Sequence, residues 1–454
     1  MPFPQMPPRC VGCILAVAGA LLIGLVLGSR PSRAEALLLI DVESGKVLEG
    51  ENATYPWYPA SVTKLMTTYV TLKALRDRRL TLDTLVTVSP NAVAQQPSKM
   101  GFKTGTQLTV DNALKMMLVH SANDMAVVLA EGVSGSIDKF SDEMNAAARH
   151  LGMTQTSYVN PNGLPDDEQI TSARDLAILA RALIKEFPEF DSYWHIGSIK
   201  LGKRVIRNTN RLIDEYPGAD GMKTGFICAS GFNLVATATR GNKRLVAVVL
   251  GASSSAARAA KAAQLLERGF TASPLSWLMP SLGTVDQLVP VDATPPNLRD
   301  DICGKNRGRQ ASEEAEEEAA AAAAGSSFML SNVRGAPVRA SSILTSGLVF
   351  SNPPVEVFVG PPHHPGDPVA ATAPAGKPAG KPAAKTAAAK AAAKSDAPAE
   401  SAPSPDVPAT IALKPWPGTE AASTSAGGKP KPKPTVVAAK PKTTSKTAHK
   451  TDQH

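Results

Sequence analysis

The chain has 454 residues and carries 48 Lys and Arg against 40 Asp and Glu, a formal net charge of +8. This length suits one large domain or two of ordinary size. Polarity is uneven, because periodic apolar patterns extend to about Phe270, whereas the chain beyond Gly366 is mainly Ala, Pro, Lys, Ser and Thr. We expect no nucleic-acid partner in spite of the positive charge, because the chain begins with an export signal.

The N-terminus is typical of an exported protein. Residues 10–28 form an apolar run, and the small residues after it permit cleavage behind Ala34 or Ala36. The run is long for a signal peptide and nearly long enough to span a bilayer, so a retained membrane anchor is the alternative. We predict a signal peptide over residues 1–34 and a periplasmic or otherwise extracytoplasmic protein in both cases.

The cysteines are interpreted in that exported setting. Outside the export segment only Cys228 and Cys303 remain. An even pair in a compartment where disulfides persist predicts a Cys228–Cys303 bond, with two buried thiols as the alternative. In the loop-entropy model a loop of this size contributes roughly 4 kcal/mol to stability. Nothing in the sequence has the spacing of a zinc site, and we expect neither metal nor cofactor.

The first half of the chain begins with a hairpin and continues with helices. Residues 36–50 are typical of a hairpin, because an apolar run is followed by the turn residues Ser44-Gly45. Apolar residues with helical spacing then recur, and the last helix opens with a capping residue. The predicted helices cover residues 61–80, 110–133, 136–152 and 171–187.

The pattern changes to strands near the end of this part. Residues 219–253 alternate in polarity and are rich in Val, Ile and Thr, with turns near 229–231 and 241–242, which predicts three antiparallel strands. A final helix follows over residues 255–270. Together with the first hairpin, these strands predict an α/β fold in which one sheet of about five strands carries helices on its faces.

The rest of the chain has weaker patterns. Residues 271–365 are predicted to be a weakly structured extension, in which the strand-like pieces 328–330 and 355–359 are compatible with a small β module. Residues 366–454 lack apolar residues for a core and are predicted to be a disordered basic tail. Such a polycation either contacts anionic cell-wall polymers and lipid headgroups or serves as a solvated spacer.

A serine and a lysine stand one helical turn apart at the head of the first predicted helix. Ser61 and Lys64 occur in 58-YPASVTKLMTTYV-70, so their side chains point the same way. A serine hydroxyl becomes a nucleophile when a base removes its proton, and a neutral lysine serves as that base when burial or a nearby cation disfavours its charge. The alternative is a capping serine followed by a surface lysine.

Two further motifs favour the chemical interpretation. Ser121 and Asn123 lie in 121-SAND-124, where the first can relay a proton and the second can hold a peptide. Lys223 and Thr224 lie in 222-MKTGF-226, where they offer a positive charge and a hydroxyl. Gly225 leaves the strand bare, so that a substrate backbone can approach it.

These motifs resemble a known family. Ser-x-x-Lys, Ser-x-Asn and Lys-Thr-Gly in this order are similar to those of penicillin-binding proteins and serine β-lactamases. The spacings and flanking stretches are similar to the low-molecular-mass D-alanyl-D-alanine carboxypeptidases over roughly residues 36–270. Those stretches include 160-NPNGL-164 and 171-TSARDLA-177. The resemblance implies a β-lactamase/transpeptidase-like sheet with an all-helical subdomain, and a catalytic domain over residues 35–270.

The resemblance also implies a reaction. Ser61 would attack the carbonyl between the two terminal D-alanines of a peptidoglycan stem peptide, with Lys64 as general base. Ser121 would pass the proton toward the leaving D-alanine, and water would hydrolyse the acyl-enzyme. β-Lactam antibiotics would be trapped as covalent inhibitors at the acyl stage. Backbone N–H groups of Ser61 and Phe226 would form the oxyanion hole.

The remaining residues are implied to bind substrate. Asn123 would hold the peptide, Lys223 and Thr224 would face its terminal carboxylate, and Arg258 matches an arginine near that carboxylate. Lys223 would also be the cation that disfavours charge on Lys64. Phe226 departs from the family, where this position is often polar or a different aromatic residue, so substrate preference and deacylation rate are the properties it puts in doubt.

Several alternatives share this sequence pattern. D,D-endopeptidase cleavage of cross-links would use the same residues. A β-lactamase would need a well-placed carboxylate, for which Asp166, Asp167 and Glu168 are the candidates. His120 beside Ser121 invites a Ser-His interpretation, but without a Gly-x-Ser-x-Gly elbow it is expected to line the cleft or the core. A wall-binding protein without catalysis would have lost the nucleophile or the base, and both are present.

Overall fold

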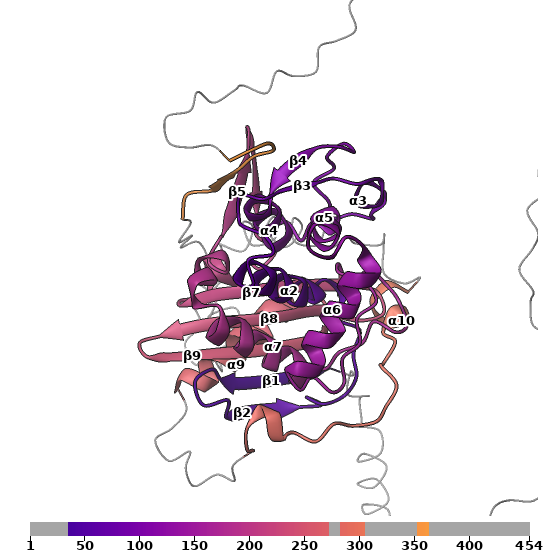
Figure 1. Ribbon diagram of the computed structural model, residues 1–454. Coiled ribbons are helices and arrows are strands. Elements are labelled where there is room, and N and C mark those ends of the chain that lie inside the picture. The colour runs from indigo at the N-terminus through magenta and orange to yellow at the C-terminus, as the bar shows by residue number, and fades with distance from the viewer. Residues whose placement is uncertain (1–34, 272–281, 305–351, 363–454) are drawn as a thin grey trace, which may run out of the picture. The chain divides into compact units, whose positions relative to one another are not determined.

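The computed structural model describes residues 35–271, 282–304 and 352–362 (Figure 1). The predicted signal peptide, the strand-like piece at 328–330 and the basic tail lie outside the described residues. Within the described ranges no helix is both long enough and apolar enough to cross a membrane.

The centre of the fold is a five-stranded sheet with the order β2-β1-β9-β8-β7, antiparallel throughout. Its first two strands are the predicted hairpin, turned at Gly45 with φ +69°. The three late strands continue the sheet from β1, which pairs with β9. The prediction of one sheet made from both ends of the catalytic region is therefore confirmed. The strands are β1 (Ala36–Asp41), β2 (Val47–Glu51), β7 (Ala219–Ile227), β8 (Gly231–Arg240) and β9 (Lys243–Ala252).

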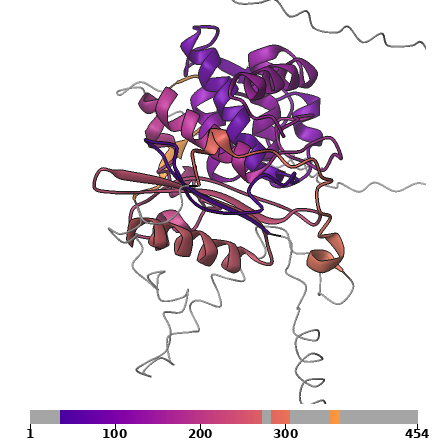
Figure 2. The same ribbon diagram turned by 90° about the horizontal axis from the view of Figure 1, so that it is seen from below.

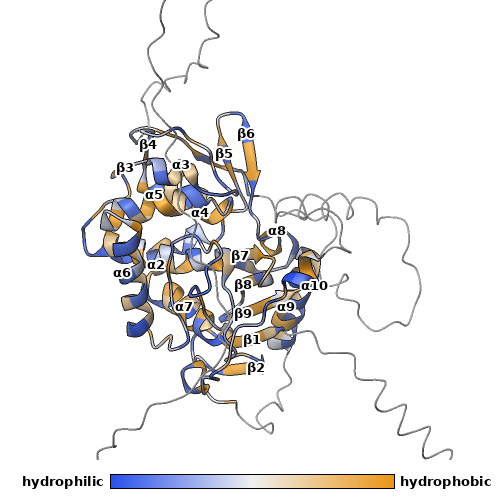
Figure 3. Ribbon diagram, turned by 90° about the vertical axis from the view of Figure 1, so that its right-hand side faces the viewer, coloured by the Kyte–Doolittle hydropathy of each residue, from blue (hydrophilic) through white to orange (hydrophobic). Residues whose placement is uncertain are grey.

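Helices cover both faces of this sheet, as predicted. Helix α7 (Ala173–Glu186) packs against β9 and β1 on one face, and α9 (Ser255–Thr271) packs against β9 and β8 on the other (Figure 2). Strands β1 and β9 are almost entirely apolar, whereas α9 alternates between hydrophilic and apolar residues (Figure 3). This difference follows from burial, because the central strands are covered on both faces and the helix on only one.

A helical cluster lies over the same face of the sheet as α7 and extends beyond the β7 edge (Figures 1 and 2). Its helices are α2 (Lys64–Arg76), α3 (Pro90–Ala94), α4 (Val110–Val119), α5 (Asn123–Ser134) and α6 (Ile137–His150). The predicted single helix over residues 110–133 is wrong, because α4 and α5 are separate. Ser121 between them has φ +59°, a left-handed conformation that a continuing α-helix does not accommodate.

Short strands close the far end of this cluster. Strand β3 (Leu85–Thr87) pairs with β4 (Gln107–Thr109), and β5 (Ser198–Leu201) forms a hairpin with β6 (Arg204–Arg207). Strand β10 (Val355–Val357) lies parallel to β5, so this part of the predicted extension joins the helical cluster. Glu356 pairs with Lys200 at 3.0 Å, and the N–H of Phe358 donates to Asn112 Oδ1 at 3.2 Å.

A segment after α9 borders the sheet. Near its start, the N–H of Val47 donates to Gly283 O and the N–H of Val285 donates to Gly45 O, which forms an isolated antiparallel bridge between Lys46 and Thr284. The segment then runs to a short helix beside the end of β7 (Figure 1). It contains the 3-10 turn η4 (Val285–Gln287) and helix α10 (Arg299–Cys303), and Cys303 is disulfide-bonded to Cys228.

Candidate active site

Ser61 lies in a 3-10 turn, η1 (Ala60–Thr63), directly before α2. Ala60 adopts the left-handed conformation with φ +50°, which turns the chain sharply in front of the serine. The N-terminus of α2 has no side-chain cap, so Ser61 is not a capping serine. Its Oγ instead accepts a hydrogen bond from Lys64 Nζ at 2.8 Å.

Lys64 is completely buried, and its ammonium position is fixed by two further acceptors. Nζ lies 2.7 Å from Asn123 Oδ1 and 2.8 Å from Asn162 O. A carbonyl oxygen only accepts, whereas the Ser61 hydroxyl both accepts and donates. A neutral amine with its two hydrogens on Asn123 and Asn162 therefore directs its lone pair at the Ser61 hydroxyl. This is the geometry that deprotonation of a serine by a lysine requires.

Asn162 was not predicted as a site residue, although its loop was quoted for the family resemblance. Gly163 beside it has φ +83°, and a Cβ there would lie 1.9 Å from Ala60 O, so only glycine fits. The buried Gln169 side chain holds the same loop, because its Oε1 accepts from the N–H groups of Val159 and Asn160. A signal was present in the Asn-Gly turn of 160-NPNGL-164, but a backbone carbonyl leaves no mark of its own in a sequence.

The second lysine is buried on β7 against the break between α4 and α5. Lys223 Nζ donates to Ser121 Oγ at 2.8 Å and to Thr224 O at 3.0 Å. Both side chains are almost fully buried, Ser121 at 3% and Lys223 at 1% exposure. The left-handed turn at Ser121 thus directs its hydroxyl toward the sheet, and the three predicted motifs meet at one place.

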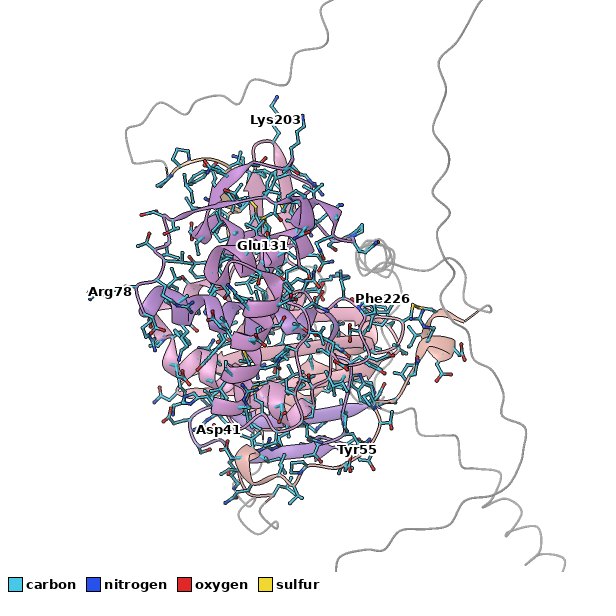
Figure 4. The ribbon with its side chains drawn as sticks, turned by 45° about the vertical axis from the view of Figure 1, so that its right-hand side comes forward. Asp41, Tyr55, Arg78, Glu131, Lys203 and Phe226 are labelled. Atoms are coloured by element: carbon cyan, nitrogen blue, oxygen red, sulfur yellow. A yellow bond between two sulfur atoms is a disulfide. The ribbon has the colours of Figure 1, made fainter. Side chains whose placement is uncertain are left out.

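Gly225 stands where β7 touches the turn that carries the serine. A Cβ at this position would lie 2.8 Å from Ser61 N and 2.9 Å from Val62 N. Any side chain would push η1 away from the strand, because contacts that short do not occur at real Cβ atoms. Phe226 follows, half-buried, with its ring stacked on Phe232 at 4.2 Å between centroids. Figure 4 shows it beside the disulfide at the end of the strand.

Asn123 is bound on both sides of its amide. Oδ1 accepts from Lys64, while Nδ2 donates to Gln96 O at 2.9 Å and Pro97 O at 3.2 Å. The next residue, Asp124, holds the same loop, because its buried carboxylate accepts from the N–H groups of Met100 and Gly101. The amide predicted to hold a peptide therefore positions Lys64 in this structure.

Arg258 is buried at the start of α9. Its Nη1 donates to Asn233 O at 3.3 Å, and its guanidinium lies 5.9 Å from the Phe232 ring centroid. Asn233 is the register partner of Gly225 and also donates through Nδ2 to Tyr58 O and Pro59 O. This asparagine, which was not predicted, therefore ties the turn before Ser61 to the sheet; its only signal was a polar residue inside an apolar strand.

The comparisons with known proteins agree with this geometry. A family model described as D-alanyl-D-alanine carboxypeptidase, peptidase family S11, matches residues 28–254. The chain belongs to this family. The D-alanyl-D-alanine carboxypeptidase DacC of Escherichia coli is 39% identical over 244 residues, 52% of this chain and 61% of that protein. DacF of Bacillus subtilis is 36% identical over 244 residues, 52% of this chain and 62% of that protein.

Solved structures support the same fold. Penicillin binding protein 6B from Escherichia coli matches with a TM-score of 0.50 and 35% identity, covering 53% of this chain and 79% of that chain. The chain spans about three fifths of the length of the two curated relatives named above. The predicted membership of the D-alanyl-D-alanine carboxypeptidase family and the predicted sheet with helices on both faces are thus confirmed.

The carboxylates that a β-lactamase would need lie at the surface of this S11 domain. Asp166, Asp167 and Glu168 are all exposed, and Asp166 accepts from the N–H of Glu168 within its own turn. Burial, followed by the charge of Asp167, raises the pKa of the Tyr58 phenol. Among the described residues no group of three or more His, Cys, Asp or Glu side chains is arranged to hold a metal ion.

The turn between β7 and β8, which follows Phe226 and forms the rim of the site, is held by contacts from two segments. Cys228 is bonded to Cys303, and the N–H of Leu298 donates to Ala229 O at 2.9 Å. From the other side, the indole N–H of Trp57 donates to Ser230 O at 3.0 Å. The turn between β7 and β8 is therefore held both by the segment after α9 and by the chain that leads to Ser61.

Proposed function

We propose that this protein is an exported serine-type D-Ala-D-Ala carboxypeptidase that removes the terminal D-alanine from peptidoglycan stem peptides and is acylated by penicillins. One observation carries the proposal. Lys64 Nζ is held by two carbonyl oxygens with Ser61 Oγ at 2.8 Å, so a neutral amine has its lone pair on the nucleophile. The S11 family and the name of penicillin binding protein 6B supply the substrate and inhibitor classes.

The acylation step follows from these positions. Lys64 takes the Ser61 proton while Oγ attacks the carbonyl carbon of the penultimate D-alanine. The N–H groups of Ser61 and Phe226 stabilise the resulting oxyanion, and Gly225 permits the close approach of strand and turn that this requires. The C–N bond then breaks, and the proton returns through Lys64 and Ser121 to the leaving amine.

The other site residues bind substrate. Lys223, Thr224 and Arg258 supply positive charge and a hydroxyl for the terminal carboxylate. Asn123 positions Lys64 and, when a stem peptide enters, exchanges its loop contacts for the peptide backbone. Water hydrolyses the ester on Ser61, which releases the shortened peptide and restores the hydroxyl. A β-lactam forms the same ester and remains on the enzyme.

The test uses the full chain and the diacetylated tripeptide Lys-D-Ala-D-Ala. Wild-type protein is expected to release free D-alanine, and Ser61→Ala is expected to release none. Release that survives this substitution contradicts the mechanism. A fluorescent penicillin that labels wild type but not Ser61→Ala identifies the acylated residue independently of turnover.

A further inference from the structure

A second buried hydroxyl lies against Thr224, the threonine of the Lys-Thr-Gly motif. Thr224 Oγ1 donates to Thr209 Oγ1 at 2.8 Å, and both residues are nearly inaccessible, at 1% and 5% exposure. Thr209 follows the β5–β6 hairpin, fifteen residues before its partner. Neither composition nor the family motifs assign it a role.

The backbone holds Thr209 firmly in this place. Its N–H donates to Val119 O at 3.2 Å, at the last residue of α4. On either side, Asn208 Nδ2 donates to Ile196 O and Asn210 Nδ2 donates to Gly221 O on β7, at 2.8 and 2.7 Å. The hydroxyl is therefore presented to Thr224 by a segment anchored to both the helical cluster and the sheet.

We propose that Thr209 is a positioning residue that directs the Thr224 hydroxyl toward the terminal carboxylate of the substrate, an inference that rests on the proposed function. A threonine hydroxyl has one hydrogen to donate. In this structure the hydrogen of Thr224 is directed at Thr209 and is not offered to a ligand. Carboxylate binding requires Thr224 to turn its O–H outward.

Thr209 favours this rotation of the Thr224 hydroxyl. Thr209 has a hydrogen of its own, and its oxygen lies 2.8 Å from Thr224 Oγ1, so a small rotation of its side chain would let it donate to Thr224 once the Thr224 hydrogen has moved. The hydrogen bond between the two hydroxyls would then be reversed, and no proton would leave either oxygen. A hydroxyl that accepts one hydrogen bond also donates a stronger one, which favours an anionic ligand.

The experiment compares kcat and KM for D-alanine release by wild type, Thr209→Val, Thr224→Val and the double variant. Because one hydrogen bond to a charged group is strengthened indirectly, Thr209→Val is expected to lower kcat/KM about tenfold, mainly through KM. Thr209→Ser is expected to restore it to within about twofold, because the hydroxyl returns. The double variant is expected to match Thr224→Val, since Thr209 acts only through that residue.

A matched control separates this effect from loss of a buried hydroxyl in general. Thr237 on β8 is fully buried, and its Oγ1 has no hydrogen-bond partner among the described residues, so Thr237→Val is expected to leave kcat/KM unchanged. Additive losses in the double variant, or wild-type kinetics of Thr209→Val, overturn the inference alone. Wild-type protein that releases no D-alanine overturns the proposed function, and the inference with it.

Discussion

The two ends of helix α2 place cations in opposite surroundings. At its beginning, Lys64 is completely buried and contacts a hydroxyl and two carbonyl oxygens. At its end, Arg76 pairs with Glu189 at 2.9 Å with both side chains about half exposed, and Arg79 beyond it pairs with Glu143 at 2.8 Å. One helix thus carries a buried amine at one end and solvated ion pairs at the other.

The two ends of α2 differ in how strongly water screens their cations. Water screens the pairs at the end of α2, so each contributes little to stability or to reactivity. Around Lys64 water is excluded and the dielectric is low, so its interactions are stronger than those of the surface pairs, and the proposed mechanism uses this buried amine as its base. Burying the Lys64 amine is unfavourable by itself, and hydrogen bonds with groups from three segments, at Ser61, Asn123 and Asn162, offset this desolvation.

The largest effect is expected from Lys64→Met, which keeps the side-chain volume and removes the buried amine from this end of α2. D-Alanine release is expected to fall by about 10³-fold or more, since general-base catalysis is worth about 10²–10⁴-fold. The melting temperature is expected to fall, because Asn123 Oδ1 and Asn162 O lose their buried donor, and an unsatisfied buried acceptor costs about 1–3 kcal/mol. Activity within tenfold of wild type would show that Lys64 is not the base.

Gly225→Ala tests the contact between β7 and the serine turn. The added Cβ would meet Ser61 N and Val62 N below 3 Å, so the turn must shift, and a displacement of this kind costs about 10²-fold in acylation rate. Penicillin-labelling kinetics measure that rate. Gly50→Ala on β2 is the matched control, because its nearest neighbour would lie at 3.6 Å. Equal labelling by both variants contradicts the steric argument.

The rim of the site is expected to show an intermediate effect on stability. Replacing Cys228 and Cys303 together by alanine removes a cross-link across 75 residues and is expected to cost about 2–4 kcal/mol of unfolding free energy. Denaturant unfolding measures the loss. A reducing agent should destabilise wild type to the same extent and leave the double variant unaffected; a response of the double variant would point to another cause.

The smallest effect is expected at the exposed ion pair between Arg79, just beyond α2, and Glu143 on α6. Burial alone would raise the pKa of Glu143, but hydrogen bonds from Arg79 and Ser134 prevail and lower it. A lowered pKa stabilises the fold above the ordinary carboxyl pKa, and the gain disappears as pH falls through the folded value. Glu143→Gln is therefore expected to cost about 0.5 kcal/mol at pH 7, discounted for exposure, and less at pH 3. Thermal melts at both pH values test this, and an equal loss at pH 3 would contradict it.

Much of the sheet could be predicted from local patterns. The runs rich in Val, Ile and Thr in 219–253 and the hairpin at 36–50 predicted five strands in the correct segments, because β-branched residues suit a pleated sheet and turn residues mark the strand ends. The break at Ser121 was missed for the converse reason. Residues on both sides have helical periodicity, and only the left-handed backbone of Ser121 separates them.

By itself the sequence determined which side chains were candidates for chemistry: a serine and lysine one turn apart, a serine with an asparagine, and Lys-Thr-Gly on a strand. The tertiary structure decided what surrounds them. Asn162 O reaches Lys64 across 98 residues, and Thr209 reaches Thr224 from another loop. Periodicity reports only on neighbours along the chain, whereas the surroundings of a buried amine depend on segments that meet after folding, and a carbonyl oxygen is present at every residue.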